Sequence, residues 1–516
     1  MSEHTTRGAW FGKSFRKVHI LYVSPAWARD RGVKFDAEET AANLAGAGVD
    51  CVELYCKDHH GVCYYPSSDG LQYPRDVVGE LCEAVRQRGM RFIAYFSVCF
   101  DAYALGVHPE WRATGQDGSA RWQAPFFWSC LRSPYRDYAL RQIRELVGRY
   151  RIDGLWLDIV PFAWDEPQEV WMQTTLPAAC YCPSCQAGLP AWTGRPLPRP
   201  DEEWTPELRR AAYEYSLGGV REFLEDARDI LDAKRPDALM TYNGANGPAD
   251  PLRLGDLVSI EGHPPHFLRE SFIGSWARGT GKPFEILTAG GLPASLSGWN
   301  GFDQKPPQLL RVEAAIGAAN GGSAVVGQAP YPNGETPPGH YTGFARAFEP
   351  LKSVEATGLL HPRSVGEVGI VLATKPDRAP RGWTAMLGGA ETAYRALRNA
   401  HLQCEVLPRA EDLERYRLVV LSDQMALDDA EIETIRGYVA GGGAVLAAGL
   451  TGVLDGDGQP RAEGPLDGVL GIETLGPTGW PHTYLLLDDS PLRDGITDIP
   501  ILSNRPSLGA RAGRAE

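Results

Sequence analysis

Short apolar runs alternate with longer amphipathic stretches along the first two thirds of the chain. Runs of four to six residues rich in Val, Ile, Leu and Tyr are typical of strands buried on both faces. We expect such strands at 18–23, 50–55, 91–96, 154–158, 238–242, 257–260, 283–287 and 323–326. Repeated alternation of strands with helices predicts a closed parallel (β/α)8 barrel, the TIM barrel, rather than an open sheet.

The stretches between these runs carry helix signals. Apolar residues recur there three and four positions apart, and glycine follows the last periodic residue where a helix should end. We expect helices from near Asp36 and over 74–89, 134–150, 206–234 and 308–320.

A second α/β pattern begins after Ser364. We expect strands at 368–372, 404–407, 418–421 and 444–448, with helices over 391–400 and up to Ala440. This alternation is typical of a doubly wound, flavodoxin-like sheet. The sequence therefore predicts an N-terminal tail at 1–15, a catalytic barrel at 16–363 and a further α/β domain at 364–516. The last of these has an irregular end, which indicates that it is incomplete at its C-terminus.

Composition narrows the partners. The formal net charge is −14 and no basic stripe is visible, which argues against a nucleic acid or an anionic membrane and favours a neutral small molecule or oligosaccharide. No N-terminal apolar segment resembles an export signal, and no run is long enough to span a membrane. We therefore expect a cytoplasmic protein whose ten cysteines are reduced thiols or metal ligands.

Polar residues that directly follow the barrel strands are the candidates for chemistry. Barrel enzymes carry their active sites at the carboxyl ends of the strands. Asp158 ends the fourth run, Asn243 follows the fifth and Glu261 follows the sixth. Hydrolysis of a glycosidic bond needs two carboxyl groups that flank the bond. We therefore expect Asp158 and Glu261 to be the catalytic pair, with Asn243 contacting the substrate.

Other acids compete for the second role. Glu285 falls within the seventh strand rather than at its end, and Glu53, Asp101 and Asp165 are further rivals to Glu261. Asp153 precedes the fourth strand, where a structural role is expected.

Several residues in the strand-end loops are candidates for contacting a sugar. Imidazoles suit sugar hydroxyls, and aromatic rings suit the apolar faces of sugars. His59 and His60 stand together after the second strand, beside aromatic residues. The remaining candidates in such loops are Lys57, Asp101, Trp27 and His263.

Cys180, Cys182 and Cys185 form a dense cluster in the loop after the fourth strand. Three thiolates this close can supply three of the four ligands of a structural Zn²⁺. Cys130 is the first candidate for the fourth ligand and Cys99 the second. We expect no cofactor for catalysis itself.

Two motifs resemble the α-L-fucosidase family of glycoside hydrolases. The segment KDHHGVCYYPS at 57–67 is similar to the family's strand-two signature, and YRIDGLWLD at 150–158 is similar to its strand-four motif. The resemblance implies that Asp158 is the nucleophile and that His59 and His60 contact the sugar. Gly61 and Val62 depart from the family's pattern after the histidines. The family does not supply the acid/base, so Glu261 rests on its position alone.

The overall arrangement also resembles β-galactosidases that carry a trimerisation domain. In those proteins a barrel with a C-x-C-x-x-C zinc loop precedes an amidotransferase-like domain without catalytic residues. Their catalytic pair are glutamates on strands four and seven, whereas Asp158 ends strand four here. The combination is most similar to the hypothetical glycosyl hydrolase 6 family.

These patterns predict a retaining exo-glycosidase of α-L-fucosidase-like type that acts on a neutral sugar. A β-galactosidase-like glycosidase and a non-catalytic carbohydrate-binding barrel remain the alternatives. Cys404 lies on a strand rather than at a nucleophile turn, which argues against amidotransferase activity in the second domain. The resemblance implies a homo-oligomer, a dimer or a trimer.

Overall fold

The computed structural model divides the chain into two compact units, Met1–Pro362 and Arg363–Glu516. It describes residues 7–8, 10–23, 30–123, 125–160, 179–243, 252–262, 267–290, 304–358, 364–372, 382–456, 460–477, 483–485, 501–503 and 508–513. No helix among these residues is long and apolar enough to cross a membrane.

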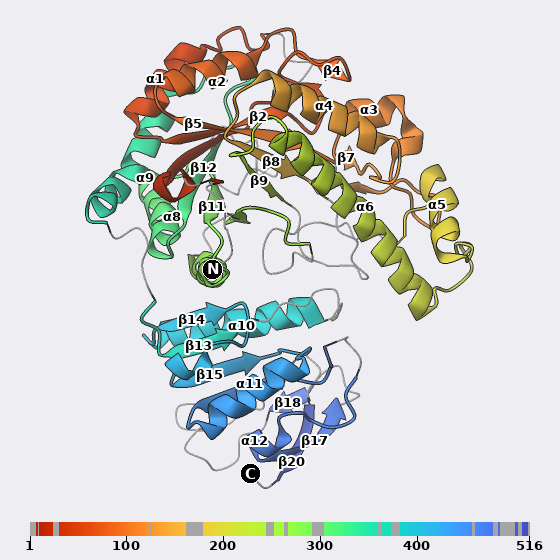
Figure 1. Cartoon of the computed structure of the whole chain (residues 1–516). Coiled ribbons are helices and arrows are strands. Elements are labelled where there is room, and N and C mark those ends of the chain that lie inside the picture. Colours follow the sequence, from red (N-terminus) through yellow and green to blue (C-terminus); the bar gives the residue numbers. More distant parts are fainter. Residues whose placement is uncertain are drawn as a thin grey trace. The chain divides into compact units, whose positions relative to one another are not determined.

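The first unit is a parallel α/β barrel (Figure 1). Its eight described barrel strands are β1 (Arg16–Ile20), β2 (Cys51–Lys57), β5 (Arg91–Ser97), β8 (Gly154–Asp158), β9 (Leu239–Tyr242), β10 (Val258–Glu261), β11 (Phe284–Ala289) and β12 (Ser323–Gln328). β12 pairs with β1, and from β1 each barrel strand pairs with the next as far as β9; β10 pairs with β11, and β11 with β12. The described residues form no strand pairing between β9 and β10. Between β9 and β10, the amide of Asp256 donates to the carbonyl of Met240 across 2.8 Å. The barrel predicted from the sequence is confirmed.

Helices and short hairpins fill the connections between the barrel strands. The helices are α1 (Ala37–Gly46), α2 (Val77–Gln87), α3 (Ala102–Val107), α4 (Tyr135–Arg149), α5 (Pro183–Thr193), α6 (Pro206–Asp232), α7 (Phe267–Gly279), α8 (Pro307–Ala319) and α9 (Pro338–Ala356). The short strands are β3 (Val62–Cys63), β4 (Leu71–Gln72), β6 (Trp122–Gln123) and β7 (Phe126–Phe127), and two 3-10 turns lie at Phe11–Lys13 and Pro109–Trp111.

Local sequence sets where the helices begin. The side chain of Asp36 accepts a hydrogen bond from the amide of Glu39 across 2.9 Å, and α1 starts directly after it. Asp76 caps α2 in the same way through the amide of Gly79. These carboxylates satisfy amide groups that have no partner within the first helical turn.

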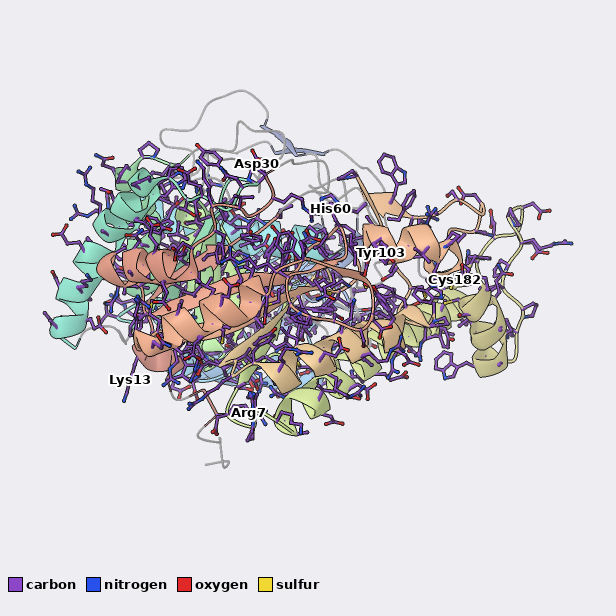
Figure 2. The ribbon with its side chains drawn as sticks, turned by 90° about the horizontal axis from the view of Figure 1, so that it is seen from above. Arg7, Lys13, Asp30, His60, Tyr103 and Cys182 are labelled. Carbon is purple, nitrogen blue, oxygen red and sulfur yellow. The ribbon has the colours of Figure 1, made fainter. Side chains whose placement is uncertain are left out.

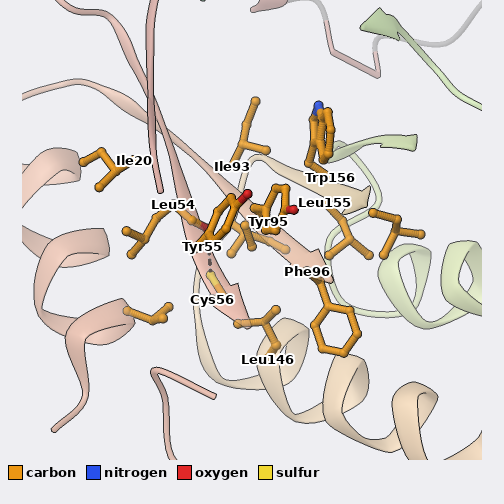
Figure 3. Packing of buried hydrophobic residues seen from close by; sticks show 14 of the residues in the cluster. Ile20, Leu54, Tyr55, Cys56, Ile93, Tyr95, Phe96, Leu146, Leu155 and Trp156 are labelled. Atoms are coloured by element: carbon orange, nitrogen blue, oxygen red, sulfur yellow. Dashed lines mark hydrogen bonds between the residues drawn. The ribbon is translucent and has the colours of Figure 1, made fainter. Parts of the chain in front are cut away.

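Side chains along each barrel strand point alternately into the barrel interior and toward the surrounding helices. Figure 3 shows Tyr55, Tyr95 and Trp156 on one side of their strands, while Leu54 and Phe96 point to the other. The register pairs Tyr55 with Tyr95 and Tyr95 with Trp156, so these rings form one layer across the barrel. Adjacent residues of a strand face opposite sides, which explains the two sets.

The N-terminal segment contributes to the closed end of the barrel. Phe11 is buried against Leu239 and Leu257, and the ammonium of Lys17 lies 3.4 Å from the centre of its ring. Phe11–Lys13 of the predicted tail therefore form packed structure, in which the ring of Phe11 covers the N-terminal ends of β9 and β10. The sequence interpretation missed this because a short segment without periodicity reads as a loop.

The second unit holds a parallel sheet with the order β14-β13-β15-β16. Its strands are β13 (Val368–Val371), β14 (Cys404–Leu407), β15 (Leu418–Ser422) and β16 (Ala444–Ala448), with helices α10 (Gly382–Asn399), α11 (Asp429–Ala440) and α12 (Asp467–Leu470) and a 3-10 turn at Leu413–Arg415. Two antiparallel pairs follow, β17 (Ile472–Pro477) with β20 (Leu508–Ala512) and β18 (Thr483–Leu485) with β19 (Ile501–Ser503). The strand order matches the flavodoxin-like expectation.

Candidate active site

Asp158 is the last residue of β8, at the carboxyl end of the barrel. It is two residues after Trp156, so both side chains point into the barrel. Its carbonyl accepts a hydrogen bond from the amide of Val98 across 2.8 Å, which ties this end of β8 to the chain after β5. The next residue, Ile159, has a φ of 55°, a conformation that a β-branched residue rarely adopts. Such strain is frequent beside functional groups.

The amide of Asn243 connects the two predicted catalytic acids. Its Nδ2 donates to Asp158 Oδ1 across 3.0 Å and also to Glu261 Oε1. Asp158 and Glu261 are the last residues of β8 and β10, and Asn243 directly follows β9. Two contacts of hydrogen-bond length through one nitrogen limit the distance between these carboxylate oxygens to about 6 Å. The two acids therefore share one side of the barrel mouth.

The other oxygen of Asp158 is held from β5. The hydroxyl of Tyr95 donates to Asp158 Oδ2. Because both oxygens accept a hydrogen bond, the carboxylate is fixed in orientation as well as in position. A donor at each oxygen favours the ionised form.

Burial and the charge of a second acid raise the pKa of Asp158, whereas its two hydrogen bonds lower it. Burial, followed by the negative charge of Glu261, raises the pKa of Asp158 from its ordinary value of 3.8 to about 6. The hydrogen bonds from Tyr95 and Asn243 lower this pKa and limit the rise. Asp158 is therefore mostly ionised at neutral pH and takes up a proton in mildly acidic solution.

His59 lies beside Asp158, with its Nε2 3.7 Å from Asp158 Oδ2. Its Nδ1 contacts Ser97 Oγ at 2.8 Å, and the Ser97 hydroxyl donates to the carbonyl of Phe100 at 2.9 Å. Ser97 can therefore only accept from His59, so Nδ1 carries the hydrogen and Nε2 is left as an acceptor. Burial lowers the pKa of His59 to about 3, which keeps the ring neutral.

Asp58 organises the loop that carries the two histidines. Its carboxylate accepts hydrogen bonds from the amides of His60 and Val62 and from the hydroxyl of Tyr64. Gly61 has a φ of +83°, and a Cβ there would lie 2.0 Å from an oxygen of Asp101. This is the physical reason for glycine directly after the histidine pair.

His60 is exposed, and its neighbour His59 is partly buried. Its ring contacts Phe126 edge-on at 5.1 Å, and its carbonyl accepts from the amide of Tyr103 (Figure 2). Phe126 also contacts His59, at 5.5 Å. The hairpin that holds Phe126 therefore brings an aromatic face to both histidines.

Lys57 and Asp101 were expected to contact substrate, but they form an internal ion pair. Their charged atoms are 2.8 Å apart and both side chains are fully buried. The Lys57 ammonium also contacts the hydroxyl of Tyr135 and the ring of Phe96, on the helical side of the sheet. Asp101 caps α3 as well. Charges buried in this way need partners, so we assign both residues to support of the loop rather than to substrate.

Three further expectations fall on other parts of the chain. Trp27, His263 and Asp165 lie outside the described residues.

Two other acids that the sequence offered in place of Glu261, Glu53 and Glu285, are fully buried inside the barrel. Asp153 binds the side chains of Arg86 and Arg91 before β8, as its structural interpretation predicts.

The four predicted cysteines converge, although they come from separate segments. One sulfur from each of Cys130, Cys180, Cys182 and Cys185 lies within 4.8 Å of the others. Cys182 precedes α5 (Figure 2), and Cys185 lies in its first turn. The amides of Thr114 and Cys182 donate to the sulfur of Cys180. This cluster could hold a metal ion. Cys99, the second candidate for the fourth ligand, is not part of it.

The sequence interpretation missed Tyr95 and Ser97 and gave Trp156 no role beyond flanking Asp158. All three lie on the same inward face as Asp158, and the register aligns Tyr95 with Trp156 and Ser97 with Asp158. Counting back two residues from each predicted strand end would have identified Trp156. Tyr95 and Ser97 needed the register between β5 and β8, which the sequence does not state.

Comparison with known proteins agrees with this picture. Residues 36–159 match the family model described as Hypothetical glycosyl hydrolase 6. The match ends one residue after Asp158. A second model, the Beta-galactosidase trimerisation domain, matches residues 374–478. The resemblance to the hypothetical glycosyl hydrolase 6 family, with a trimerisation domain after it, is confirmed.

Two curated relatives cover different parts of the chain. Tissue alpha-L-fucosidase of Rattus norvegicus is 30% identical over 154 residues, which are 28% of this chain and 29% of that protein. Beta-galactosidase BgaH of Haloferax lucentense is 23% identical over 537 residues, covering 88% of this chain and 76% of that protein. The fucosidase match spans less than a third of the fucosidase's own length.

Two solved structures share the fold over nearly the whole chain. Alpha-L-fucosidase isoenzyme 2 from Paenibacillus thiaminolyticus has a TM-score of 0.73 and 20% identity, covering 97% of this chain and 73% of its own. The beta-galactosidase from Bacillus circulans sp. alkalophilus has a TM-score of 0.70 and 15% identity, covering 99% and 82%. At these identities the likeness shows the fold, and the chemistry must be argued from the site.

Proposed function

We propose that the barrel unit is a retaining exo-glycosidase that acts on a neutral sugar. Asp158 is the nucleophile and Glu261 is the acid/base. The observation that carries the proposal is the amide of Asn243, which binds both carboxylates at the barrel mouth. The relationship to glycosyl hydrolase families supports the same reaction class.

The reaction proceeds in two displacements. The Asp158 carboxylate attacks the anomeric carbon while Glu261 gives its proton to the departing glycosidic oxygen, which leaves as an alcohol. A covalent glycosyl ester on Asp158 results. Glu261 then takes a proton from water, the oxygen of that water attacks the same carbon, and the ester bond breaks to restore Asp158.

The spacing of the acids is compatible with retention. Retaining enzymes hold their carboxyl groups about 5 to 5.5 Å apart, whereas inverting enzymes need about 6.5 to 9.5 Å to admit a water. The limit of about 6 Å set by the shared Asn243 amide is compatible with the first range. Asp158 also has a fixed orientation, which a nucleophile requires.

His59 fits the role of a sugar-binding residue. Its Nε2 is a bare acceptor beside the nucleophile, so it can accept a hydrogen bond from a sugar hydroxyl. Next to His59, His60 adds a second imidazole and Phe126 adds an aromatic face. The resemblance to α-L-fucosidases favours a fucoside-like substrate.

A panel of aryl glycosides that includes α-L-fucoside and β-D-galactoside tests this proposal. Wild-type protein should release the phenol from at least one substrate, with Asp158→Ala and Glu261→Ala both severely impaired. Azide should restore turnover to one of the two variants, as a small nucleophile does in the absence of a carboxylate. Lys57→Met removes a buried charge beneath the loop that carries His59 and His60. It is the control for activity that is lost through damage to this loop rather than through loss of a catalytic acid. Near-normal turnover by Asp158→Ala would remove Asp158 from the mechanism, and sugar binding without turnover would favour the non-catalytic alternative.

The β-galactosidase-like alternative requires a glutamate at the end of the seventh strand. The only acid within β11 is Glu285, at its second position, buried in the barrel interior. This placement disfavours a catalytic pair of that type in the described part of the barrel. If Asp158→Ala still hydrolyses the β-D-galactoside in preference to the other substrates, the β-galactosidase-like alternative is favoured.

We also propose that the four cysteines bind a structural zinc ion. Zn–S bonds of about 2.3 Å in a tetrahedron place sulfurs about 3.8 Å apart, and the four sulfurs here already lie within 4.8 Å. Cys130 and Cys185 have their sulfurs 3.5 Å apart, too far for a disulfide. The four thiolates would supply all the ligands and tie α5 to the segment before α4.

The trimerisation-domain match supports self-association of the chain, as a dimer or a trimer. Light scattering coupled to size exclusion measures the mass directly. Full-length protein should elute as a homo-oligomer. A concentration-independent monomer of 56.4 kDa would contradict this part of the proposal.

A further inference from the structure

The interior of the barrel below Asp158 is charged. Lys17, Glu53 and Glu285 are all fully buried there, where most barrels of this type hold branched apolar side chains. The ammonium of Lys17 contacts Glu285 Oε2 at 2.7 Å. Buried charges cost free energy, and an apolar core of the same volume is often at least as stable. Stability alone therefore does not account for them.

Glu285 holds the indole of Trp156 from below. Its Oε1 accepts from Trp156 Nε1 at 3.3 Å, a hydrogen shared with the hydroxyl of Ser259 at the same distance. Trp156 in turn stacks on Tyr95, with ring centres 5.2 Å apart and planes 17° apart. Glu285 thus fixes the ring against which Tyr95 lies.

Glu53 reaches the same layer through His19. Its Oε2 lies 3.0 Å from His19 Nδ1. The imidazole contacts Tyr55, Tyr95 and Trp156 edge-on, with centroid distances of 5.3, 5.2 and 5.9 Å. Tyr55 stacks on the other side of Tyr95 at 3.7 Å (Figure 3). Tyr95 is therefore packed on both faces and at its edge, and its hydroxyl has one direction available.

We propose that Glu285 and Glu53 are positioning residues of the reaction, which hold Trp156 and His19 against Tyr95 and so aim the Tyr95 hydroxyl at Asp158. Neither glutamate touches the substrate. The inference rests on the proposed glycosidase activity for its kinetic test only. An error of about 1 Å in the position of a reacting group can lower a rate by about 100-fold.

Two variants separate positioning from stability. The double variant Lys17→Met/Glu285→Leu removes both charges of the pair and the acceptor of Trp156. At pH 6 its stability should be equal to or higher than that of wild type. Lys17 and Glu285 both lower the pKa of Glu53, which burial raises to about 7, so their removal leaves Glu53 protonated and no unpaired charge remains. Its kcat should fall on the order of 10-fold or more with little change in KM. Glu285→Gln keeps an acceptor for Trp156 but removes the carboxylate that contacts the Lys17 ammonium at 2.7 Å, so it should be less stable and yet more active than the double variant.

Asp153→Asn is the matched control. Asp153 precedes the opposite end of β8 and binds Arg86 and Arg91. The variant should lower stability without lowering kcat. If kcat instead follows stability across the three variants, or if the double variant keeps full kcat, the positioning role is wrong.

An activity-free measurement distinguishes this inference from the proposed function. The coupling between the Tyr95 hydroxyl and the Asp158 carboxylate is obtained from the unfolding free energies of Tyr95→Phe, Asp158→Asn and the double variant. Repeating the cycle in the Lys17→Met/Glu285→Leu background should reduce this coupling sharply, whereas the Asp153→Asn background should leave it intact. An unchanged coupling would overturn the inference whether or not the protein hydrolyses glycosides.

Discussion

The Nε2 atom of His59 lies 3.7 Å from Asp158 Oδ2, yet the two residues do not form an ion pair at neutral pH. The pKa of His59 is lowered to about 3 by burial, so its ring is neutral there. Ser97 holds the hydrogen on Nδ1 and leaves a lone pair facing the site. Nε2 of His59 is therefore an acceptor beside Asp158, and the ring supplies no positive charge to that carboxylate.

His59→Phe should raise KM without moving the acidic limb of the pH profile. Phenylalanine removes the acceptor at Nε2, and a lost hydrogen bond of about 1.4 kcal/mol raises KM about tenfold. The acidic limb of kcat/KM should stay near pH 6, because it reports Asp158. A shift of the limb to higher pH in this variant would show that His59 acts as a cation.

Tyr95→Phe should move the same limb to higher pH. The hydrogen bond from Tyr95 lowers the pKa of Asp158, so its removal raises that pKa. We expect a shift of about one pH unit, because one charge-assisted hydrogen bond is lost. The rate profile on an activated aryl glycoside measures it. Asp158 would titrate independently of this hydroxyl if the limb stayed in place.

Asp158→Asn should stabilise the protein while abolishing turnover. Folding raises the pKa of Asp158 from 3.8 to about 6, so the folded state holds this proton more tightly than the unfolded chain. The ionised side chain therefore costs nothing below pH 3.8 and about 3 kcal/mol above pH 6. Urea unfolding should show the variant more stable at pH 8 and nearly equal to wild type at pH 4. Equal stabilities at pH 8 would contradict the raised pKa.

Glu53→Gln should also stabilise the protein at high pH, but the gain in stability should develop over a different pH range. Burial raises the pKa of Glu53 from 4.5 to about 7. The free-energy penalty of its charge therefore grows between pH 4.5 and pH 7, to about 3 kcal/mol. Lys17 and Glu285 face the same carboxyl, so their titration must be followed in the variant as well. If the stability difference between variant and wild type does not change between pH 4.5 and pH 7, Glu53 is not the group that takes up a proton in this range.

Cys130→Ser should release the metal that we propose. Purified wild type should contain about one zinc per chain by elemental analysis, since four thiolates complete a tetrahedral site. The variant should contain less metal and unfold at a lower temperature. Cys99→Ser, a buried cysteine outside the cluster, is the matched control and should keep its metal. Equal zinc content in the two variants would exclude the four-cysteine site.

The periodic pattern was sufficient for most of the fold. Runs of apolar residues located β8, β14 and β16 at the residues where they occur. β8 and β14 are buried along their whole length, and strands buried on both faces have a strong composition signal. The first strand was expected two residues late, and α10 begins nine residues before the expected helix at 391. Strand and helix ends depend on capping and pairing, which short-range patterns describe poorly.

The position of Asp158 at a strand end was also available from the sequence. Parallel barrel topology brings the carboxyl ends of all strands to one face, so the sequence pattern was enough to place Asp158, Asn243 and Glu261 on that face. The sequence also identified Cys180, Cys182 and Cys185, because their spacing in the chain is dense. These inferences work because each depends on one segment and on the general geometry of the fold.

Tertiary structure alone decided what each polar side chain contacts. Lys57 stands one residue before Asp58 and two before His59, yet a local shift in the pairing of β2 with β5 turns it to the helical layer, where it pairs with Asp101. Glu53 and Glu285 are more than 200 residues apart in the chain and meet in the barrel interior. Side-chain direction and long-range contact arise from register and closure of the barrel. The sequence determined the strands and their order, and only the closure of the barrel determined which charged side chains lie at its mouth and which support them from the interior.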